Sequence, residues 1–128
     1  MKYLCLIYVD ETKLQEAPPA HVNAVAQQCL DQTRKLEGAG RLLAAERLES
    51  VLSATTVRHE GGKITVTDGP FAETKEQLAG FYLIDAHDLD EAIRIAGEIP
   101  PGHFGCIEVR PIMQELHPAE AAPAARRG

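Results

Sequence analysis

The chain has 128 residues, 45% of them hydrophobic and 25% charged, which is the length and composition of one soluble globular domain. Its 13 Lys and Arg against 19 Asp and Glu give a formal net charge of −6. This balance argues against a nucleic-acid-binding surface, because phosphate recognition draws on clustered basic residues. The apolar stretches are too short for a membrane helix, which needs roughly 20 such residues. We therefore expect a cytoplasmic protein that binds neither nucleic acid nor membrane.

The three cysteines, Cys5, Cys29 and Cys106, are too far apart in sequence for a metal knuckle or a redox pair. Each lies in an apolar periodic segment, where a free cysteine packs as a small hydrophobe. We therefore expect unpaired structural thiols in a reducing compartment. The histidines show no metal-ligand spacing either, so we expect no metal site and no cofactor.

The first predicted element is a strand at residues 3–9, an apolar run rich in aromatic and branched side chains. Residues 10–19 are polar and end in two prolines, which predicts a loop. The next segment is predicted to be a helix that ends at Gly38, because its apolar residues share one helical face. These residues are Val22, Val25, Ala26, Cys29, Thr33 and Leu36. Residues 42–48 are a strand candidate, although the Ala-Ala-Glu sequence within them would suit a helix equally well.

A β-hairpin between residues 55 and 67 is the clearest local prediction. Two runs of β-type residues flank the Gly-Gly pair at 61–62, which tolerates the positive φ that a two-residue turn requires. If that turn sets the register, His59 lies opposite Ile64 and Val57 lies opposite Val66, all on one face.

The second half of the chain predicts a strand, a helix and a strand. Residues 78–85 are typical of a central strand. Asp88 can cap the following helix, with Glu91 as its reciprocal capping partner, and Pro100 ends that helix. Residues 105–112 alternate apolar and charged side chains, which predicts a half-buried strand.

Together these elements predict an α+β fold over residues 1–113. It is a ferredoxin-like antiparallel sheet with two helices on one face and an inserted β-hairpin. Residues 114–128 are rich in Ala and Pro, and we expect them to form a disordered tail. The uncovered face of the sheet would expose more apolar area than a lone domain tolerates. We therefore predict a homodimer with the two sheets face to face.

Residues 67–85, TDGPFAETKEQLAGFYLID, closely resemble the signature of the YCII-related family, in its DGPF branch. The opening MKYLCLIY, the DLDEA segment at 88–92 and the IEVRPI segment at 107–112 resemble the start, second helix and last strand of that family. The resemblance implies a dimeric α+β barrel. It also implies an association with extracytoplasmic-function sigma factors, which such proteins accompany in bacterial gene neighbourhoods. YCII-type relatives include small-molecule enzymes that use His and Asp.

Two residues are candidates for proton transfer. Asp68 ends a strand, where its carboxylate either caps the turn through the following backbone amides or lies at the mouth of a pocket between helices and sheet. His21 precedes the first helix, where YCII-type relatives look similar. As a neutral imidazole beside a carboxylate it would remove a proton from an activated carbon; otherwise it is a surface residue.

Four residues are candidates for substrate binding. Arg110 is either the cationic clamp for a carboxylate or the partner of Glu108 in an ion pair. Tyr82 would line the same pocket as Asp68. Lys75 either meets an anionic group at the rim or belongs to a solvated loop. Phe71 either anchors the core or the dimer interface, or stacks on a ligand.

Two functions are compatible with these residues. The first is a small enzyme or ligand binder that carries out cofactor-free acid–base chemistry on a small organic acid, such as elimination, isomerisation or decarboxylation. The second is a non-catalytic dimeric regulatory or interaction module, whose acidic surface meets a basic region of a sigma factor. The hypotheses differ on whether Asp68, His21 and Arg110 share a cavity.

Overall fold

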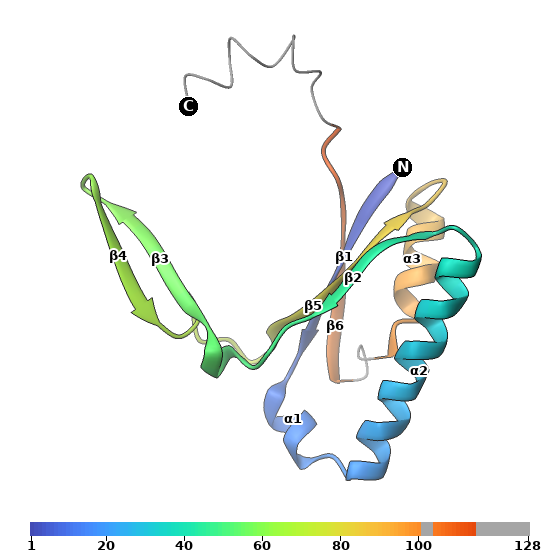
Figure 1. Ribbon diagram of the computed structural model, residues 1–128, viewed down its shortest axis with the longest axis horizontal. Helices are drawn as coiled ribbons and strands as arrows, with labels where there is room; N and C mark the ends of the chain where they lie inside the picture. Colours follow the sequence, from blue (N-terminus) through green and yellow to red (C-terminus); the bar gives the residue numbers. More distant parts are fainter. Residues whose placement is uncertain (101–103, 115–128) are drawn as a thin grey trace.

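The structure, a computed structural model, describes residues 1–100 and 104–114 and has two layers, a sheet and the helices that cover it (Figure 1). All of the predicted tail except Gln114 lies outside the described residues. The strands are β1 (Lys2–Val9), β2 (Leu42–Arg47), β3 (Thr55–Glu60), β4 (Lys63–Asp68), β5 (Gln77–Asp85) and β6 (Gly105–Pro111). The helices are α1 (Glu11–Glu16), α2 (Pro19–Gly38) and α3 (Leu89–Gly97), with a short 3-10 helix η1 (Val51–Ser53).

The main sheet has four antiparallel strands in the order β2-β5-β1-β6. With its two covering helices it follows the β-α-β-β-α-β order of a ferredoxin-like fold, so the α+β prediction is confirmed. The segment with two possible readings, residues 42–48, forms strand β2 along the edge of β5. Within the described ranges, no helix is both long enough and apolar enough to cross a membrane.

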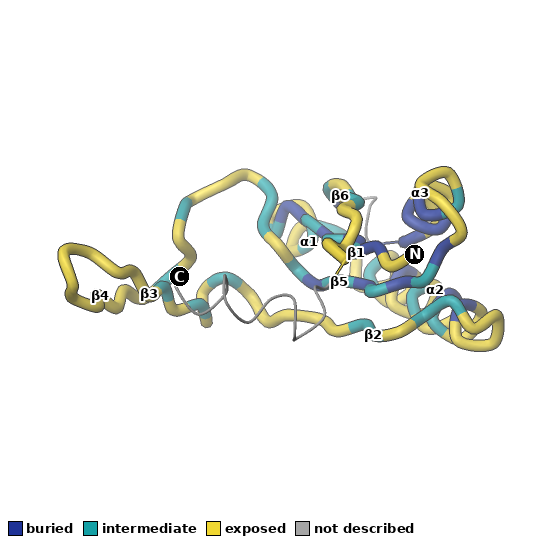
Figure 2. The backbone as a smooth tube through the Cα atoms, turned by 90° about the horizontal axis from the view of Figure 1, so that it is seen from above, coloured by how far each residue is buried: buried dark blue, intermediate teal, exposed yellow. Residues whose placement is uncertain are grey.

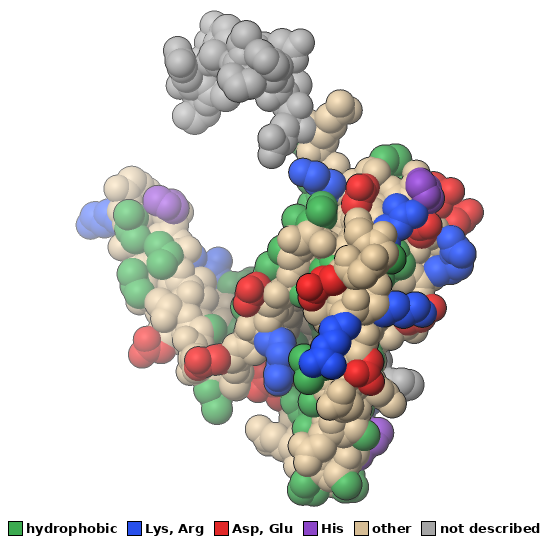
Figure 3. Space-filling model, turned by 45° about the vertical axis from the view of Figure 1, so that its right-hand side comes forward, with side chains coloured by type: hydrophobic (Ala, Val, Ile, Leu, Met, Phe, Trp, Pro, Cys, Tyr) green, Lys and Arg blue, Asp and Glu red, His purple; other side chains and the backbone are tan. Residues whose placement is uncertain are grey.

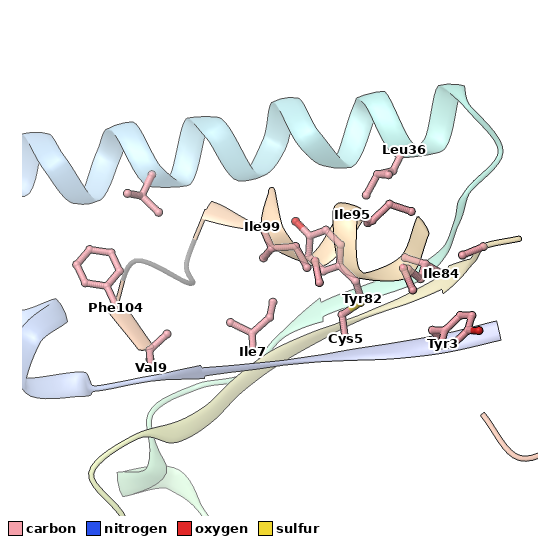
Figure 4. Close-up of a cluster of buried hydrophobic side chains, with 14 residues drawn as sticks. Tyr3, Cys5, Ile7, Val9, Leu36, Tyr82, Ile84, Ile95, Ile99 and Phe104 are labelled. Atoms are coloured by element: carbon pink, nitrogen blue, oxygen red, sulfur yellow. The ribbon is translucent and has the colours of Figure 1, made fainter. Parts of the chain in front are cut away.

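The core lies between the main sheet and helices α2 and α3. In β1, every second side chain is directed into this core. Its odd-numbered side chains from Tyr3 to Val9 are buried, and the even-numbered ones between them are half-buried. Figure 4 shows the buried side chains of the sheet directed toward the two helices. The helical side of the core consists of Val25, Leu36, Ala92, Ile95 and Ala96, with Ile99 and Phe104 beside them.

The second sheet is the predicted hairpin, β3–β4. Its register pairs His59 with Ile64 and Val57 with Val66, so the register expected from the Gly-Gly turn is confirmed. The residues at 61 and 62 have φ of 55° and 79°, which glycine adopts without strain. The hairpin projects from the main sheet on the side opposite α2 and α3, and both of its strands are exposed along most of their length (Figures 1 and 2).

One prediction for the segment before α2 is wrong: residues 11–16 form a helix and not a loop. Asp10 caps this helix, since its carboxylate Oδ1 accepts hydrogen bonds from the backbone N–H of Thr12 at 3.0 Å and of Lys13 at 3.4 Å. Only Leu14 and Ala17 of the segment pack against the core. The hydrogen bonds to Asp10 therefore stabilise this helix more than the burial of apolar side chains does.

The predicted cap of α3 is confirmed with one change of partner. The Asp88 carboxylate Oδ1 accepts from the backbone N–H of Glu91 at 2.9 Å. The Glu91 carboxylate returns to the backbone N–H of His87, at 3.0 Å, and not to that of Asp88. Arg41 also contacts Glu91, with a nitrogen–oxygen distance of 3.4 Å, and so ties the start of β2 to this cap.

Candidate functional site

The helix-free side of the main sheet, here called the outer face, carries a continuous apolar strip. Opposed strand residues share a face, so Leu4 and Leu6 of β1 lie beside Leu83 and Phe81 of β5. All four side chains are half-buried although none of the described helices covers them (Figure 1). Tyr8, the next residue of β1 on this face, lies opposite Cys106 of β6.

A group of polar and ionisable side chains borders the strip along β6. The Tyr8 hydroxyl donates to Glu108 Oε1 at 3.2 Å, and the Cys106 thiol donates to Glu76 Oε1 at 3.3 Å. Partial burial, followed by the hydrogen bond and charge of Glu108, raises the pKa of Tyr8 above its ordinary value. The pKa of Cys106 is raised by desolvation and by the neighbouring Glu76.

Sequence reasoning did not bring these side chains together, and the expectation that Cys106 packs as a small hydrophobe was wrong. Cys106 is exposed, because β6 is an edge strand and its even-numbered residues lie on the outer face. The available signal was the spacing of Cys106, Glu108 and Arg110 at every second position. Their approach to Glu76 depends on the pairing of both β5 and β6 with β1, which no local pattern shows.

Arg110 lies on the outer face, opposite Leu4. Its positive charge acts on Tyr8 and partly offsets the rise in the pKa of that hydroxyl. Among the described ion pairs none joins Arg110 to Glu108, whose carboxylate instead accepts from Tyr8. Of the two readings of Arg110, the ion pair with Glu108 is therefore not seen among the described residues.

Tyr82 lies on the opposite side of the sheet from Arg110. It faces Cys5 and the helices, is 6% exposed, and its hydroxyl is 3.3 Å from Thr33 Oγ1 of α2. Burial raises the pKa of this tyrosine. Within one chain the sheet therefore separates Tyr82 from Arg110, so the two do not line one pocket.

Asp68 ends β4 at the base of the projecting hairpin and is exposed. The turn that follows is held by the backbone N–H of Gly69 donating to the Ala54 carbonyl at 2.7 Å and by the Thr56 hydroxyl donating to the Gly69 carbonyl at 2.8 Å. In the described part of the chain, the Asp68 carboxylate makes none of the turn's hydrogen bonds. Its carboxylate is thus open to solvent on the hairpin side of the molecule.

Phe71 and Lys75 lie in the exposed loop between β4 and β5. Phe71 is 76% exposed and does not belong to the core of this chain, although its carbonyl accepts from Arg58 Nη2 at 3.0 Å. His21 lies in the first turn of α2, with its ring edge-on to Phe104 at 5.6 Å between centroids. This places His21 on the helical side, away from the hairpin that carries Asp68 (Figure 1).

None of the six predicted site residues lines either of two shallow hollows on the surface of the described chain. The larger, of about 480 Å³, runs between α3 and β6. Its lining is mainly apolar: Ile93, Ala96, Gly97, Ile99, Cys106, Ile107 and Val109. The smaller, of about 310 Å³, lies between α2 and the end of α3. Over residues 1–100 and 104–114, no three His, Cys, Asp or Glu side chains gather as a metal site would require.

The sequence of the chain is similar to those of known proteins. A family model described as the YCII-related domain matches residues 1–116. The chain is also similar to an uncharacterized protein, R00369, of Rhizobium meliloti (strain 1021). The two are 41% identical over 114 residues, which cover 88% of this chain and 92% of that protein.

Proposed function

Because the chain belongs to the YCII-related family, we propose that it acts as a homodimer whose outer faces pack together as a dimeric α+β barrel. The observation that carries this proposal is the strip of Leu4, Leu6, Phe81 and Leu83, which no element within residues 1–100 and 104–114 covers. Apolar area of this kind is stabilised when a second surface removes it from water. In a two-fold dimer the same surface of both copies forms the interface, so the apolar strip of one sheet would pack on the apolar strip of the other.

The polar border of the outer face is the proposed ligand site, and a small organic acid is the proposed ligand. Arg110 supplies the charge that binds a carboxylate, and packing of a second sheet would lower the local dielectric and strengthen that attraction. Glu108 and Tyr8, 3.2 Å apart, supply a proton acceptor and a proton donor beside it. This pair would serve cofactor-free elimination, isomerisation or decarboxylation.

The roles first considered for Asp68, His21, Phe71 and Lys75 stay predictions. Asp68 lies at the base of the projecting hairpin, whereas Lys75 directly precedes Glu76, which contacts Cys106 at the polar border of the same chain. Tyr82 has no part in the proposed site, since it faces the helices.

The second candidate function is a non-catalytic dimeric module that binds a sigma factor. It is favoured by the scatter of the predicted site residues, which lie in the hairpin, at the start of α2 and on both sides of the sheet. The motif at residues 67–85 supports a place in the DGPF branch, and the net charge of −6 suits a basic segment of such a partner. Capture of the sigma factor at micromolar concentration by the purified protein would support this function, and failure to bind would count against it.

The cytoplasm is the proposed location. Cys5, Cys29 and Cys106 are all free thiols, as is usual for proteins kept in a reducing compartment.

Thermal denaturation in the presence of small mono- and dicarboxylic acids tests the ligand site. An acid that binds the folded protein raises its unfolding temperature. We expect this rise in the wild type, its loss in Arg110→Gln, and its retention in Arg94→Gln. Arg94 is a matched control because it is an exposed arginine on α3, away from the outer face. Equal stabilisation of both variants would contradict a site at Arg110.

A further inference from the structure

The β3–β4 hairpin has one apolar side and one polar side, and both are exposed. Val57, Ile64 and Val66 form the centre of the apolar side, with exposed fractions of 56%, 63% and 65%. The register places His59 beside Ile64 on this same side, and Thr55 and Asp68 at its base. The opposite side carries threonines and charged residues, among them Arg58 and Thr65. Hydrophobic side chains gather on the visible face of the hairpin in Figure 3. Exposed apolar side chains on one side would not stabilise a hairpin that is only a solvent-exposed loop.

The hairpin is nevertheless held at a defined place. The Glu11 carboxylate accepts from the Ser50 hydroxyl at 2.7 Å and from the Val51 backbone N–H at 3.1 Å, which ties the start of the hairpin to α1. The Gly69 N–H to Ala54 carbonyl bond closes its base. The strands beyond that base form a sheet of two strands without a packing layer, and such a hairpin is marginally stable in water by itself. Its apolar side therefore needs a partner surface.

We infer that this hairpin is an arm whose apolar side packs on the second copy of the chain, an inference that rests on the proposed homodimer. The arm projects on the same side of the main sheet as the outer face, so it flanks the space that the partner's sheet would fill (Figures 1 and 2). The contact thus continues the proposed interface. In a two-fold dimer each copy supplies one arm and receives one.

The net charge of the arm is compatible with packing on a second copy of the chain. It carries two basic residues, Arg58 and Lys63, and two acidic ones, Glu60 and Asp68, so its formal charge is zero. The chain as a whole carries −6, so the remainder is acidic. A neutral arm is not repelled by the acidic body of a second copy, whereas an acidic arm would be.

Dissociation constants of the dimer, measured by sedimentation of the full-length protein, test the arm. We expect Ile64→Lys to raise the constant roughly tenfold or more, because it places a charge in the contact. Thr65→Lys adds the same charge at the next position on the opposite side, and we expect the wild-type constant. Neither residue belongs to the core, so both variants should keep the wild-type fold of the single chain, as measured by far-ultraviolet circular dichroism.

Mixed dimers of isotope-labelled and unlabelled chains give a second measurement. The arm predicts intermolecular nuclear Overhauser effects from the methyl groups of Val57, Ile64 and Val66. A wild-type protein that stays monomeric would overturn the homodimer and the arm together. A wild-type dimer with equal constants for Ile64→Lys and Thr65→Lys, and no intermolecular effects from these methyl groups, would overturn the arm and leave the sheet-to-sheet dimer standing.

Discussion

Cys5 offers a quantitative test of the core, through the dependence of stability on alkaline pH. It lies at the centre of β1, is 0% exposed, and faces the helices opposite Tyr82. Burial raises the pKa of its thiol from 9.0 to about 11. The unfolded chain therefore loses this proton at a lower pH than the folded chain does.

The sign and size of the effect follow from linkage. A raised pKa in the folded state contributes stability that is complete below pH 9.0 and is lost as the pH rises through about 11. One pKa unit corresponds to about 1.4 kcal/mol, so the free energy of unfolding should fall by about that amount between pH 8 and pH 10 on account of Cys5. The full loss, from the rise of the pKa from 9.0 to about 11, is roughly 3 kcal/mol.

Urea denaturation of the wild type and of Cys5→Ala, in reducing buffer from pH 8 to pH 11, measures this loss. Other groups with raised pKa values, such as Cys29 and Tyr82, titrate in both proteins and cancel in the difference. The stability advantage of the wild type over Cys5→Ala should shrink by roughly 1 kcal/mol by pH 10. An advantage that stays constant with pH would refute the placement of Cys5 in a desolvated core.

Three further predictions concern the sheet, a helix cap and the polar border of the outer face. Gly80→Ala should cost about 1–3 kcal/mol in urea denaturation, because an added Cβ would lie 2.6 Å from a backbone oxygen of β2, whereas Gly97→Ala, with nothing within 4 Å, should cost nothing. Asp88→Ala should lower the unfolding free energy by about 1 kcal/mol through loss of the α3 cap; an unchanged value would refute that cap. Glu108→Gln should lower the pKa of Tyr8 in an ultraviolet titration of the phenolate, and an unchanged pKa would contradict the hydrogen bond between them.

The hairpin and the α3 cap were predictable from the sequence because each depends on residues a few positions apart. The Gly-Gly turn determines the pairing of β3 with β4, since a two-residue turn leaves one register. The cap of α1 is also local, at Asp10. The segment after it has few apolar positions, however, so its sequence pattern could not be told apart from that of a polar loop. Apart from α1, the order of the main elements followed from periodicity. The predicted face of α2 was correct at Val25 and Leu36, whereas Ala26 is exposed and Gln32, which was not on that face, is buried.

The candidate site was less predictable, because it depends on the relative register of strands far apart in the chain. Alternation within β5 or β6 shows that neighbouring residues face opposite ways, and not which set faces the helices. Pairing with β1 decides this, and it turns Tyr82 inward and Arg110 outward. The contact of Glu76 with Cys106, thirty positions apart, has the same origin.

The central claim is that two copies pack through their outer faces, and sedimentation velocity on the wild type beside Leu6→Lys tests it most directly. Leu6 lies in the middle of the apolar strip, opposite Phe81, so a lysine there would place a charge between the sheets. The exposed Leu30 of α2 provides the control substitution, Leu30→Lys. We predict twice the mass of one chain for the wild type and Leu30→Lys, and a folded species of single-chain mass for Leu6→Lys. A wild type that sediments as a single chain, or a Leu6→Lys variant that stays dimeric, would contradict the account.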